Sequence, residues 1–243
     1  MLHIFPSLEA LSMAAARRIV ELTTSEVPGE PYLVALSGGN TPKRLQELLA
    51  TTFRAEVPWE RVHLFWGDER WVPPGDENSN YRMAEETLIR YVPIPPENVH
   101  PVQTDLASPE ASAAAYENEI VAMLEELGRP GMDLVLLGMG DDGHTASLFP
   151  GTPVLNEHTR LVTAMEAPLY ATVKDRVTFT YALLNRSRHI LFLAAGAGKR
   201  EPFTAIQQSR DAALQKYPAA GVEALVSTEW FVDEAAAGGL RSR

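Results

Sequence analysis

The sequence contains no cysteine among its 243 residues. This absence excludes disulfide bonds, catalysis by a thiolate and metal sites built on cysteine ligands. Long hydrophobic runs are also missing, because apolar stretches such as Ile190–Ala197 fall far short of the roughly 20 residues that cross a bilayer. The amino terminus, Met1–Pro6, lacks the basic and apolar regions of a signal peptide. These absences predict a cytoplasmic protein.

The chain has fewer basic than acidic residues. The chain has 21 Lys and Arg against 32 Asp and Glu, a formal net charge of −11. Such a surface repels nucleic acid and anionic membranes, so we expect neither as a partner. An anionic small molecule would need a local pocket of positive potential. The sequence leaves open whether the protein is a monomer or a small homo-oligomer.

Hydrophobic residues make up 45% of the chain, and apolar runs of strand length alternate with segments of helical period. Several of these runs are apolar throughout, which is typical of parallel strands covered on both faces. The expected strands are Leu2–Phe5, Tyr32–Leu36, Val62–Trp66, Asp133–Leu137, Leu161–Met165, Ile190–Ala194 and Ala224–Val226.

Helix-start signals stand between these runs. Ser7 and Ser108 each precede an apolar stripe of helical spacing, and Gly128 is the expected end of the second helix. Thr41 before a proline predicts another capped helix, and Asn80 is expected to open a further one. This alternation predicts an α/β fold, a mostly parallel twisted sheet with helices on both faces (modified Rossmann-like), as a single domain over residues 1–243.

A glycine-rich turn follows the second expected strand. Two glycines let the backbone approach a ligand closely, and free N–H groups at a helix start attract an anion. The turn therefore predicts a phosphate site, with an ordinary strand-to-helix turn as the alternative. The candidate phosphate-binding residues here are Ser37, Gly38, Gly39, Asn40 and Thr41.

Charged residues follow other expected strands. Asp68 and Arg70 belong to a dense cluster after Val62–Trp66, which could equally be a solvated loop with a local ion pair. Lys199 stands at a helix start after Ile190–Ala194 and is a candidate phosphate cation, although a single lysine is more often a surface residue. Arg176 is a further candidate cation, at the start of another extended segment.

The segment Gly138–Gly143 formally matches the dinucleotide pattern G-x-G-x-x-G. Its context does not fit that function, because only six residues separate it from the proline-rich stretch that begins at Pro150. What remains is a tight turn presenting Asp142 and His144. Histidine can accept a proton from water near neutral pH, so His144 is the candidate general base. No second histidine lies at ligand spacing, so we expect no metal.

Taken together, these segments resemble the 6-phosphogluconolactonase family, within the wider group that also holds glucosamine-6-phosphate isomerases and deaminases. The matching segments are Ser37–Pro42, Gly67–Arg70 with Asn78–Tyr81, Gly138–Pro150, Arg176–Thr180 and Gly196–Lys199. The resemblance implies hydrolysis of 6-phosphoglucono-δ-lactone in the pentose phosphate pathway, with no metal and no organic cofactor.

This resemblance and the residue types together give a working hypothesis. The phosphate is expected on the Gly38–Thr41 turn, with charge from Lys199 and Arg176, and His144 is expected to activate a water. Arg70 or a backbone N–H of residues 138–143 would stabilise the oxyanion. Asp142, or less favourably Asp68, would orient His144 or bind sugar hydroxyls.

Two alternatives come from other functional classes. A deaminase of the same group carries a glutamate where this chain has Phe149, and a tyrosine where it has Arg70, and both differences favour the lactonase. A non-catalytic sugar-phosphate sensor usually carries an additional DNA-binding or partner domain, for which we find no spare segment.

Overall fold

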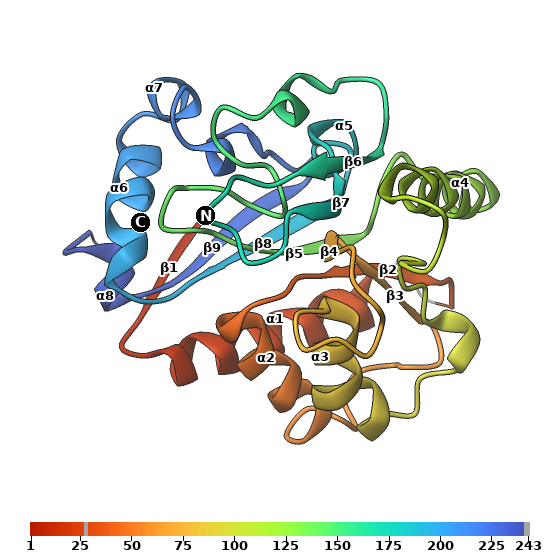
Figure 1. Cartoon of the computed structure of the whole chain (residues 1–243). Coiled ribbons are helices and arrows are strands. Elements are labelled where there is room, and N and C mark those ends of the chain that lie inside the picture. Colours follow the sequence, from red (N-terminus) through yellow and green to blue (C-terminus); the bar gives the residue numbers. More distant parts are fainter. Residues whose placement is uncertain (27–28, 241–243) are drawn as a thin grey trace.

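The computed structural model describes residues 1–26 and 29–240. Its centre is a six-stranded sheet in which every neighbouring pair is parallel. Figure 1 shows this sheet crossing the molecule. In spatial order the strands are β1 (Leu2–Phe5), β9 (Ser227–Asp233), β8 (His189–Ala194), β5 (Leu134–Gly138), β2 (Tyr32–Leu36) and β3 (Val62–Trp66). The predicted α/β class with a mostly parallel sheet is confirmed.

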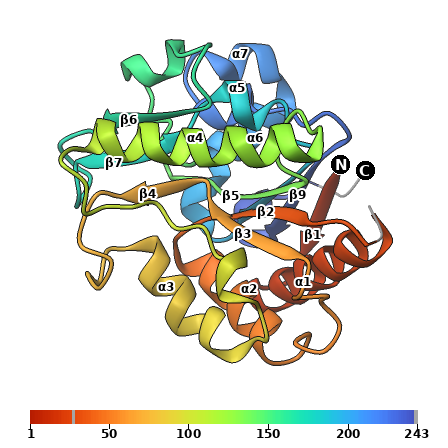
Figure 2. The same cartoon turned by 90° about the vertical axis from the view of Figure 1, so that its right-hand side faces the viewer.

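Helices cover both faces of this sheet. One face carries α1 (Leu8–Ser25), α2 (Asn40–Ala50) and α3 (Asn80–Thr87), which lie together below the sheet in Figure 2. The second face carries α4 (Pro109–Leu127), which lies above the sheet in the same view. The second face also carries α5 (Tyr181–Leu184), α6 (Arg200–Gln208), α7 (Arg210–Leu214) and α8 (Glu234–Ala237). Among the described residues no helix is long and apolar enough to cross a membrane.

Two apolar clusters fill the space between the sheet and its helices. Along β2, Val34 packs with Leu11 of α1 and Leu45 of α2, whereas its neighbour Leu33 packs on the opposite face with Ile120 of α4. Successive side chains of a strand point to opposite faces, so a strand inside this sheet must be apolar at every position. This is the physical basis of the continuous apolar runs in the sequence.

A second, three-stranded sheet was not predicted. It consists of β4 (Asp68–Arg70), β7 (Asp175–Phe179) and β6 (Val162–Glu166), paired antiparallel in that order. The strand expected at 161–165 therefore exists but does not belong to the parallel sheet. Gly67 joins the two sheets, since its N–H donates to the carbonyl of Leu36 and its carbonyl accepts from the N–H of Phe179.

Most helix boundaries agree with the sequence signals. The hydroxyls of Ser7 and Ser108 cap α1 and α4, and Gly128 ends α4 in the left-handed conformation. The expected cap at Thr41 is wrong, because α2 begins at Asn40 with Gly39 as its N-cap and without a capping side chain. The last strand begins at Ser227, after the expected Ala224–Val226. The single-domain assignment stays a prediction.

The order of the strands brings the candidate segments together. β8, β5, β2 and β3 are consecutive neighbours and run in the same direction, so their carboxyl ends lie at one edge of the sheet. In open parallel sheets this edge is the usual place for a ligand. The segments that follow these four strands carry all the candidate residues identified above except Arg176, which lies in β7.

Candidate active site

A cavity of about 400 Å³ lies at this edge of the sheet. The turn Gly38–Thr41 after β2 forms one wall, Gly138 and Met139 at the end of β5 form another, and Lys199 closes a third. The expected convergence of the phosphate-binding turn and Lys199 is thus present in the structure. These residues are more than 150 positions apart in the sequence and meet because β2, β5 and β8 are adjacent.

The turn after β2 requires glycine at two positions. Gly39 has a φ of 105°, which L-residues with side chains rarely adopt. A Cβ on Gly38 would lie 1.9 Å from Oδ1 of Asn80, so the backbone passes directly over that amide. The start of α2 therefore presents backbone N–H groups to the cavity without a side-chain cap. Ser37 is buried, and its hydroxyl is unpaired among the described residues.

Lys199 belongs to the short 3₁₀ turn Ala197–Lys199 after β8. Its Nζ lies 2.5 Å from Oδ1 of Asp141, a side chain that also lines the cavity. A Cβ on Gly198 would meet the same carboxylate at 2.5 Å, so glycine permits this approach. Without a ligand, Asp141 neutralises the lysine. An anionic ligand that displaces this carboxylate would form an ion pair with the ammonium group of Lys199.

His144 and Asp142 form a hydrogen-bonded pair on the turn after β5. Nδ1 of His144 lies 2.6 Å from Oδ1 of Asp142, and the backbone N–H of His144 donates to the same oxygen over 3.0 Å. An ionised carboxylate can only accept, so the hydrogen of the neutral ring is on Nδ1 and Nε2 has a lone pair. No described residue bonds to Nε2, and 30% of the side chain is exposed. This geometry is compatible with the expected role of His144 as a general base.

Asp142 is held in its ionised form. Burial by itself would raise the pKa of this carboxyl, but hydrogen bonds from His144 and from the hydroxyl of Tyr170 outweigh it and keep the pKa well below its usual range. The carboxylate therefore remains charged at neutral pH and can stabilise a protonated His144. The expected partnership of Asp142 with His144 is present in the structure.

The turn that carries this pair is tightly closed by its own backbone. The N–H of Gly140 donates to the carbonyl of His144, and the N–H of Gly143 donates to that of Gly140. A Cβ on Gly140 would lie 2.1 Å from Nδ1 of His144, which explains the glycine there. The backbone N–H groups of Asp141 and Asp142 donate to no acceptor among the described residues.

Phe149 supports the histidine ring from one side. Its ring centroid lies 4.3 Å from that of His144, and the guanidinium carbon of Arg176 lies 5.7 Å from the same phenyl ring. Phe149 occupies the position where the deaminase branch carries its glutamate. In this chain the apolar ring of Phe149 packs against His144, and no carboxylic acid is present at this position.

Arg176 and Asp68 form a buried pair beside this ring. Nη1 of Arg176 lies 3.6 Å from Oδ2 of Asp68, which also accepts a 2.7 Å hydrogen bond from Ser147. Burial lowers the pKa of the guanidinium while Asp68 raises it. Asp68 thus contacts the segment after His144 and not His144 itself. The structure places Arg176 here and not in the wall of the cavity that contains Lys199.

The segment after His144 contains a strained residue. Ala146 has a φ of 48°, and it is the one residue other than glycine with positive φ among those the structure describes. Such a conformation persists only when neighbouring bonds fix it. Thr145 donates to the carbonyl of Gly138, and the backbone N–H of Ser147 donates to the hydroxyl of Thr178. These bonds tie the active-site turn to both sheets.

Glu69 was part of the charged cluster, and its role is structural. Its carboxylate is buried and accepts hydrogen bonds from Ser79 and from the backbone N–H groups of Arg70, Asn80 and Tyr81. It therefore fixes the start of α3, where a negative charge is favourable. Burial raises the pKa of Glu69, against the opposing effect of these hydrogen bonds.

Arg70 lines a neighbouring cavity of about 300 Å³, which shares Gly39 and Asn40 with the first and also contains Lys43. One of its Nη atoms donates to the carbonyl of Asn78 over 2.8 Å, and its Nε is buried and unpaired among the described residues. Arg70 is therefore beside the candidate phosphate-binding turn and not part of a solvated loop.

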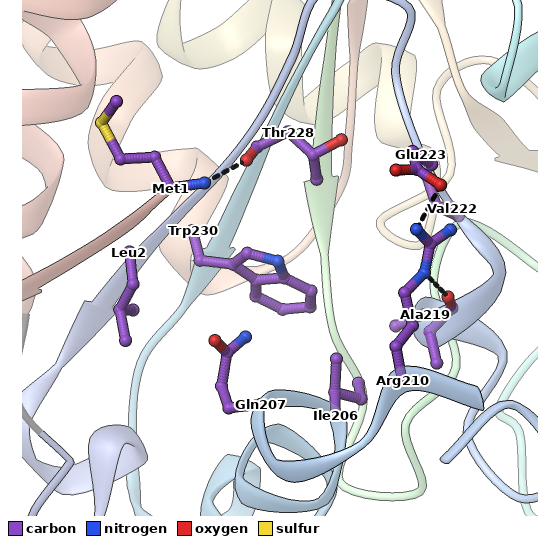
Figure 3. A pocket seen from close by; sticks show the side chains of 11 residues that line it. Met1, Leu2, Ile206, Gln207, Arg210, Ala219, Val222, Glu223, Thr228 and Trp230 are labelled. Atoms are coloured by element: carbon purple, nitrogen blue, oxygen red, sulfur yellow. Dashed lines mark hydrogen bonds and ion pairs between the residues drawn. The ribbon is translucent and has the colours of Figure 1, made fainter. Parts of the chain in front are cut away.

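A further cavity, of about 340 Å³, is drawn in Figure 3. It lies between the first residues of β1 and β9 and the helix α6, with the indole of Trp230 beside Gln207 and with Arg210 paired to Glu223. None of the candidate residues from the sequence lines it. Across the described residues, no group of three or more His, Asp or Glu could hold a metal ion.

Three contributors to the site were given no role by the sequence. Asn80 belonged to a matched segment, but only the fold shows that its amide lies against Gly38 and donates to Asp68. Ser147 also lay within a matched segment without a role of its own, and Tyr170 was not identified at all. Tyr170 is 28 positions after Asp142 and follows a different strand, so no local pattern could reveal their contact.

Comparison with known proteins shows the family of this chain and its similarity to named 6-phosphogluconolactonases. A family profile described as glucosamine-6-phosphate isomerases/6-phosphogluconolactonase matches residues 6–230. The chain belongs to this family. Within it, a 6-phosphogluconolactonase of Synechocystis sp. is 45% identical over 210 residues, which are 86% of this chain and 84% of that protein. A 6-phosphogluconolactonase of Mycobacterium bovis is 36% identical and covers 99% of this chain and 98% of its own.

Solved structures of the glucosamine-6-phosphate isomerase/6-phosphogluconolactonase family agree. The 6-phosphogluconolactonase of Trypanosoma cruzi has a TM-score of 0.82 and 30% identity, covering 99% of this chain and 97% of its own. A monomeric glucosamine-6-phosphate deaminase has a TM-score of 0.80 but only 20% identity, with 98% of each chain covered. The second likeness shows the fold alone, so the choice of chemistry rests on the site and on the more similar relatives.

Proposed function

We propose that this protein hydrolyses 6-phosphoglucono-δ-lactone to 6-phosphogluconate. The observation that carries the proposal is the His144–Asp142 pair, whose turn also contributes Met139 and Asp141 to the cavity formed with the Gly38–Thr41 turn and Lys199. Relatives at 45% and 36% identity that bear the name 6-phosphogluconolactonase support the same reaction. The reaction needs one water activated and one oxyanion stabilised, and it needs neither metal nor organic cofactor.

The chemical step begins with a water on the lone pair of Nε2. As the water oxygen forms its bond to C1 of the lactone, His144 takes a proton and Asp142 stabilises the resulting imidazolium. The tetrahedral intermediate then breaks the bond between C1 and the ring oxygen, and His144 returns the proton to that oxygen. The carboxylic acid product ionises and releases one proton to solvent.

The oxyanion is assigned to the active-site turn. The N–H groups of Asp141 and Asp142 remain available there, and backbone donors held by a rigid turn need no reorganisation during the reaction. Arg70 was the alternative. Its place beside Gly39 and Asn40 favours attraction of the phosphate instead.

The substrate phosphate is assigned to the Gly38–Thr41 turn and Lys199. Charge-assisted hydrogen bonds are roughly twice as strong as neutral ones, which offsets the acidic surface of the protein. The guanidinium of Arg176 lies over the ring of Phe149, which packs against His144, and it pairs with Asp68. We therefore assign Arg176 to the part of the site that holds the sugar ring and not to the phosphate.

The test is hydrolysis of freshly generated lactone, followed by proton release and corrected for the spontaneous rate. We expect His144→Ala to lower kcat by about 10²- to 10⁴-fold, the usual contribution of a general base. The variant should still bind 6-phosphogluconate, measured by calorimetry. Near-normal turnover of a variant that still binds product would refute the role of His144.

The same preparation distinguishes the alternatives. Release of ammonia from glucosamine 6-phosphate would identify a deaminase, and product binding without any hydrolysis by the wild-type protein would identify a sensor. The packing of Phe149 in the position of the deaminase glutamate favours the lactonase in this comparison. We also propose that the protein is cytoplasmic and a monomer or small homo-oligomer, and its net charge of −11 supports the absence of nucleic-acid and membrane partners.

A further inference from the structure

Tyr170 reaches the catalytic pair from the loop between β6 and β7. Its hydroxyl donates a 2.6 Å hydrogen bond to Oδ2 of Asp142. Burial and the neighbouring carboxylate raise the pKa of Tyr170 to about 12, so the phenol stays protonated and remains a donor at neutral pH. The contact joins the three-stranded sheet to the active-site turn of the parallel sheet.

The hydrogen bonds of Asp142 show what this contact does. Oδ1 accepts both bonds from His144, one from the ring and one from the backbone, and Oδ2 accepts from Tyr170. Among the described residues, Tyr170 is the one partner of Oδ2. Its hydroxyl therefore fixes the rotation of the carboxylate and keeps Oδ1 directed at the histidine.

The position of Tyr170 is itself supported by the site. The residue is 70% exposed, yet its ring packs edge-on against Phe149, with centroids 6.3 Å apart. Phe149 is buried and packs against His144 on the same side of the turn. One phenyl ring thus positions both the base and the tyrosine. The neighbouring Leu169 is 85% exposed and has no such contact.

We propose that Tyr170 is a positioning residue for the hydrolytic reaction, which orients Asp142 and through it His144. The inference rests on the proposed lactonase function. A donor on Oδ2 also withdraws negative charge from the carboxylate and so moderates its hold on the imidazolium. Tyr170 therefore affects both the orientation of His144 and the charge on the carboxylate that pairs with it.

Other charges around the pair were considered before assigning this effect. Arg176 on β7 lies over Phe149 and is paired with Asp68 on β4, and Lys199 is paired with Asp141 on the turn itself. Each of these positive charges has its own carboxylate partner. Replacing Tyr170 by phenylalanine leaves both ion pairs and the packing on Phe149 intact, so it isolates the hydroxyl.

The experiment compares the pH profiles of kcat for wild type and Tyr170→Phe. We expect kcat to fall about 3- to 10-fold, the effect of one partly exposed hydrogen bond to a charged group, with KM changed less than about twofold. The acid limb should move to higher pH, because Asp142 without its second donor holds the proton of His144 more strongly. NMR of the His144 ring should show its titration midpoint moving in the same direction.

Leu169→Ala is the matched control, since it alters the same loop without touching Asp142. An unchanged acid limb and kcat in Tyr170→Phe, or an equal loss in Leu169→Ala, would overturn the role of Tyr170. Failure of the underlying function is distinguishable: it would show as a wild-type protein without lactone hydrolysis. An active wild type with an unaffected Tyr170→Phe variant refutes only the positioning role.

Discussion

Replacing Asp142 by asparagine separates charge from geometry in the catalytic pair. The amide oxygen of Asn can accept both hydrogen bonds from His144, and its NH₂ can face the hydroxyl of Tyr170, which then accepts. The tautomer with the hydrogen on Nδ1 is thereby retained. What the variant loses is the negative charge that stabilises the imidazolium during the reaction.

The size of this effect follows from distance and exposure. The joined atoms are 2.6 Å apart, and both side chains are 30% exposed, so the environment lies between a protein surface and water. With charge centres about 4 Å apart and an effective dielectric constant of about 40, the interaction is about 2 kcal/mol. Loss of this stabilisation slows the step that charges His144 about 30-fold.

The assay is the pH profile of kcat/KM for the lactone. Asp142→Asn should lower the plateau about 30-fold and move the acid limb to lower pH, because the imidazolium has lost its counter-charge. This direction is opposite to that expected for Tyr170→Phe. Asp141→Asn is the matched control: it removes the adjacent carboxylate, which pairs with Lys199, and should change KM while leaving the acid limb in place. A plateau within twofold of wild type in Asp142→Asn would refute the assignment.

Three further variants test the surroundings of the site. Lys199→Ala should raise KM about 10-fold or more, the effect of one charge-assisted bond to phosphate, and an unchanged KM would contradict the assignment. Gly38→Ala places a Cβ 1.9 Å from the amide of Asn80, so phosphate binding measured by calorimetry should weaken at least about 10-fold from the cost of overpacking; normal binding would mean that the turn adapts. Glu69→Gln sets an amide NH₂ against backbone N–H donors and should destabilise the fold by about 2–3 kcal/mol in urea unfolding, whereas an unchanged midpoint would contradict the buried contacts.

The sequence was informative wherever function depends on local backbone. The Gly138–Gly143 turn places Asp142 two residues before His144, and a turn of this type brings such neighbours into hydrogen-bonding distance. The glycines of the Gly38–Thr41 turn predict a close approach for the same reason. In both cases glycine is required because a side chain would collide with a site residue.

The sequence was less informative about strand partners. β4 has three charged residues, and nothing in them indicates a strand, because their burial depends on β7 lying beside them. β6 is apolar enough to be a strand but does not encode the direction of its neighbour. The cap expected at Thr41 failed because Gly39 adopts a conformation that starts α2 two residues earlier.

By itself the sequence determined the fold class, and it predicted the two glycine-rich turns and the candidate base His144, since each depends on residues close together in the chain. Tertiary structure alone decided that Arg176 pairs with Asp68 outside the cavity that contains Lys199, and that Tyr170 donates to Asp142. These contacts join residues that are distant in sequence. They arise from strand order and from the packing of the second sheet on the first, which no local pattern of residues specifies.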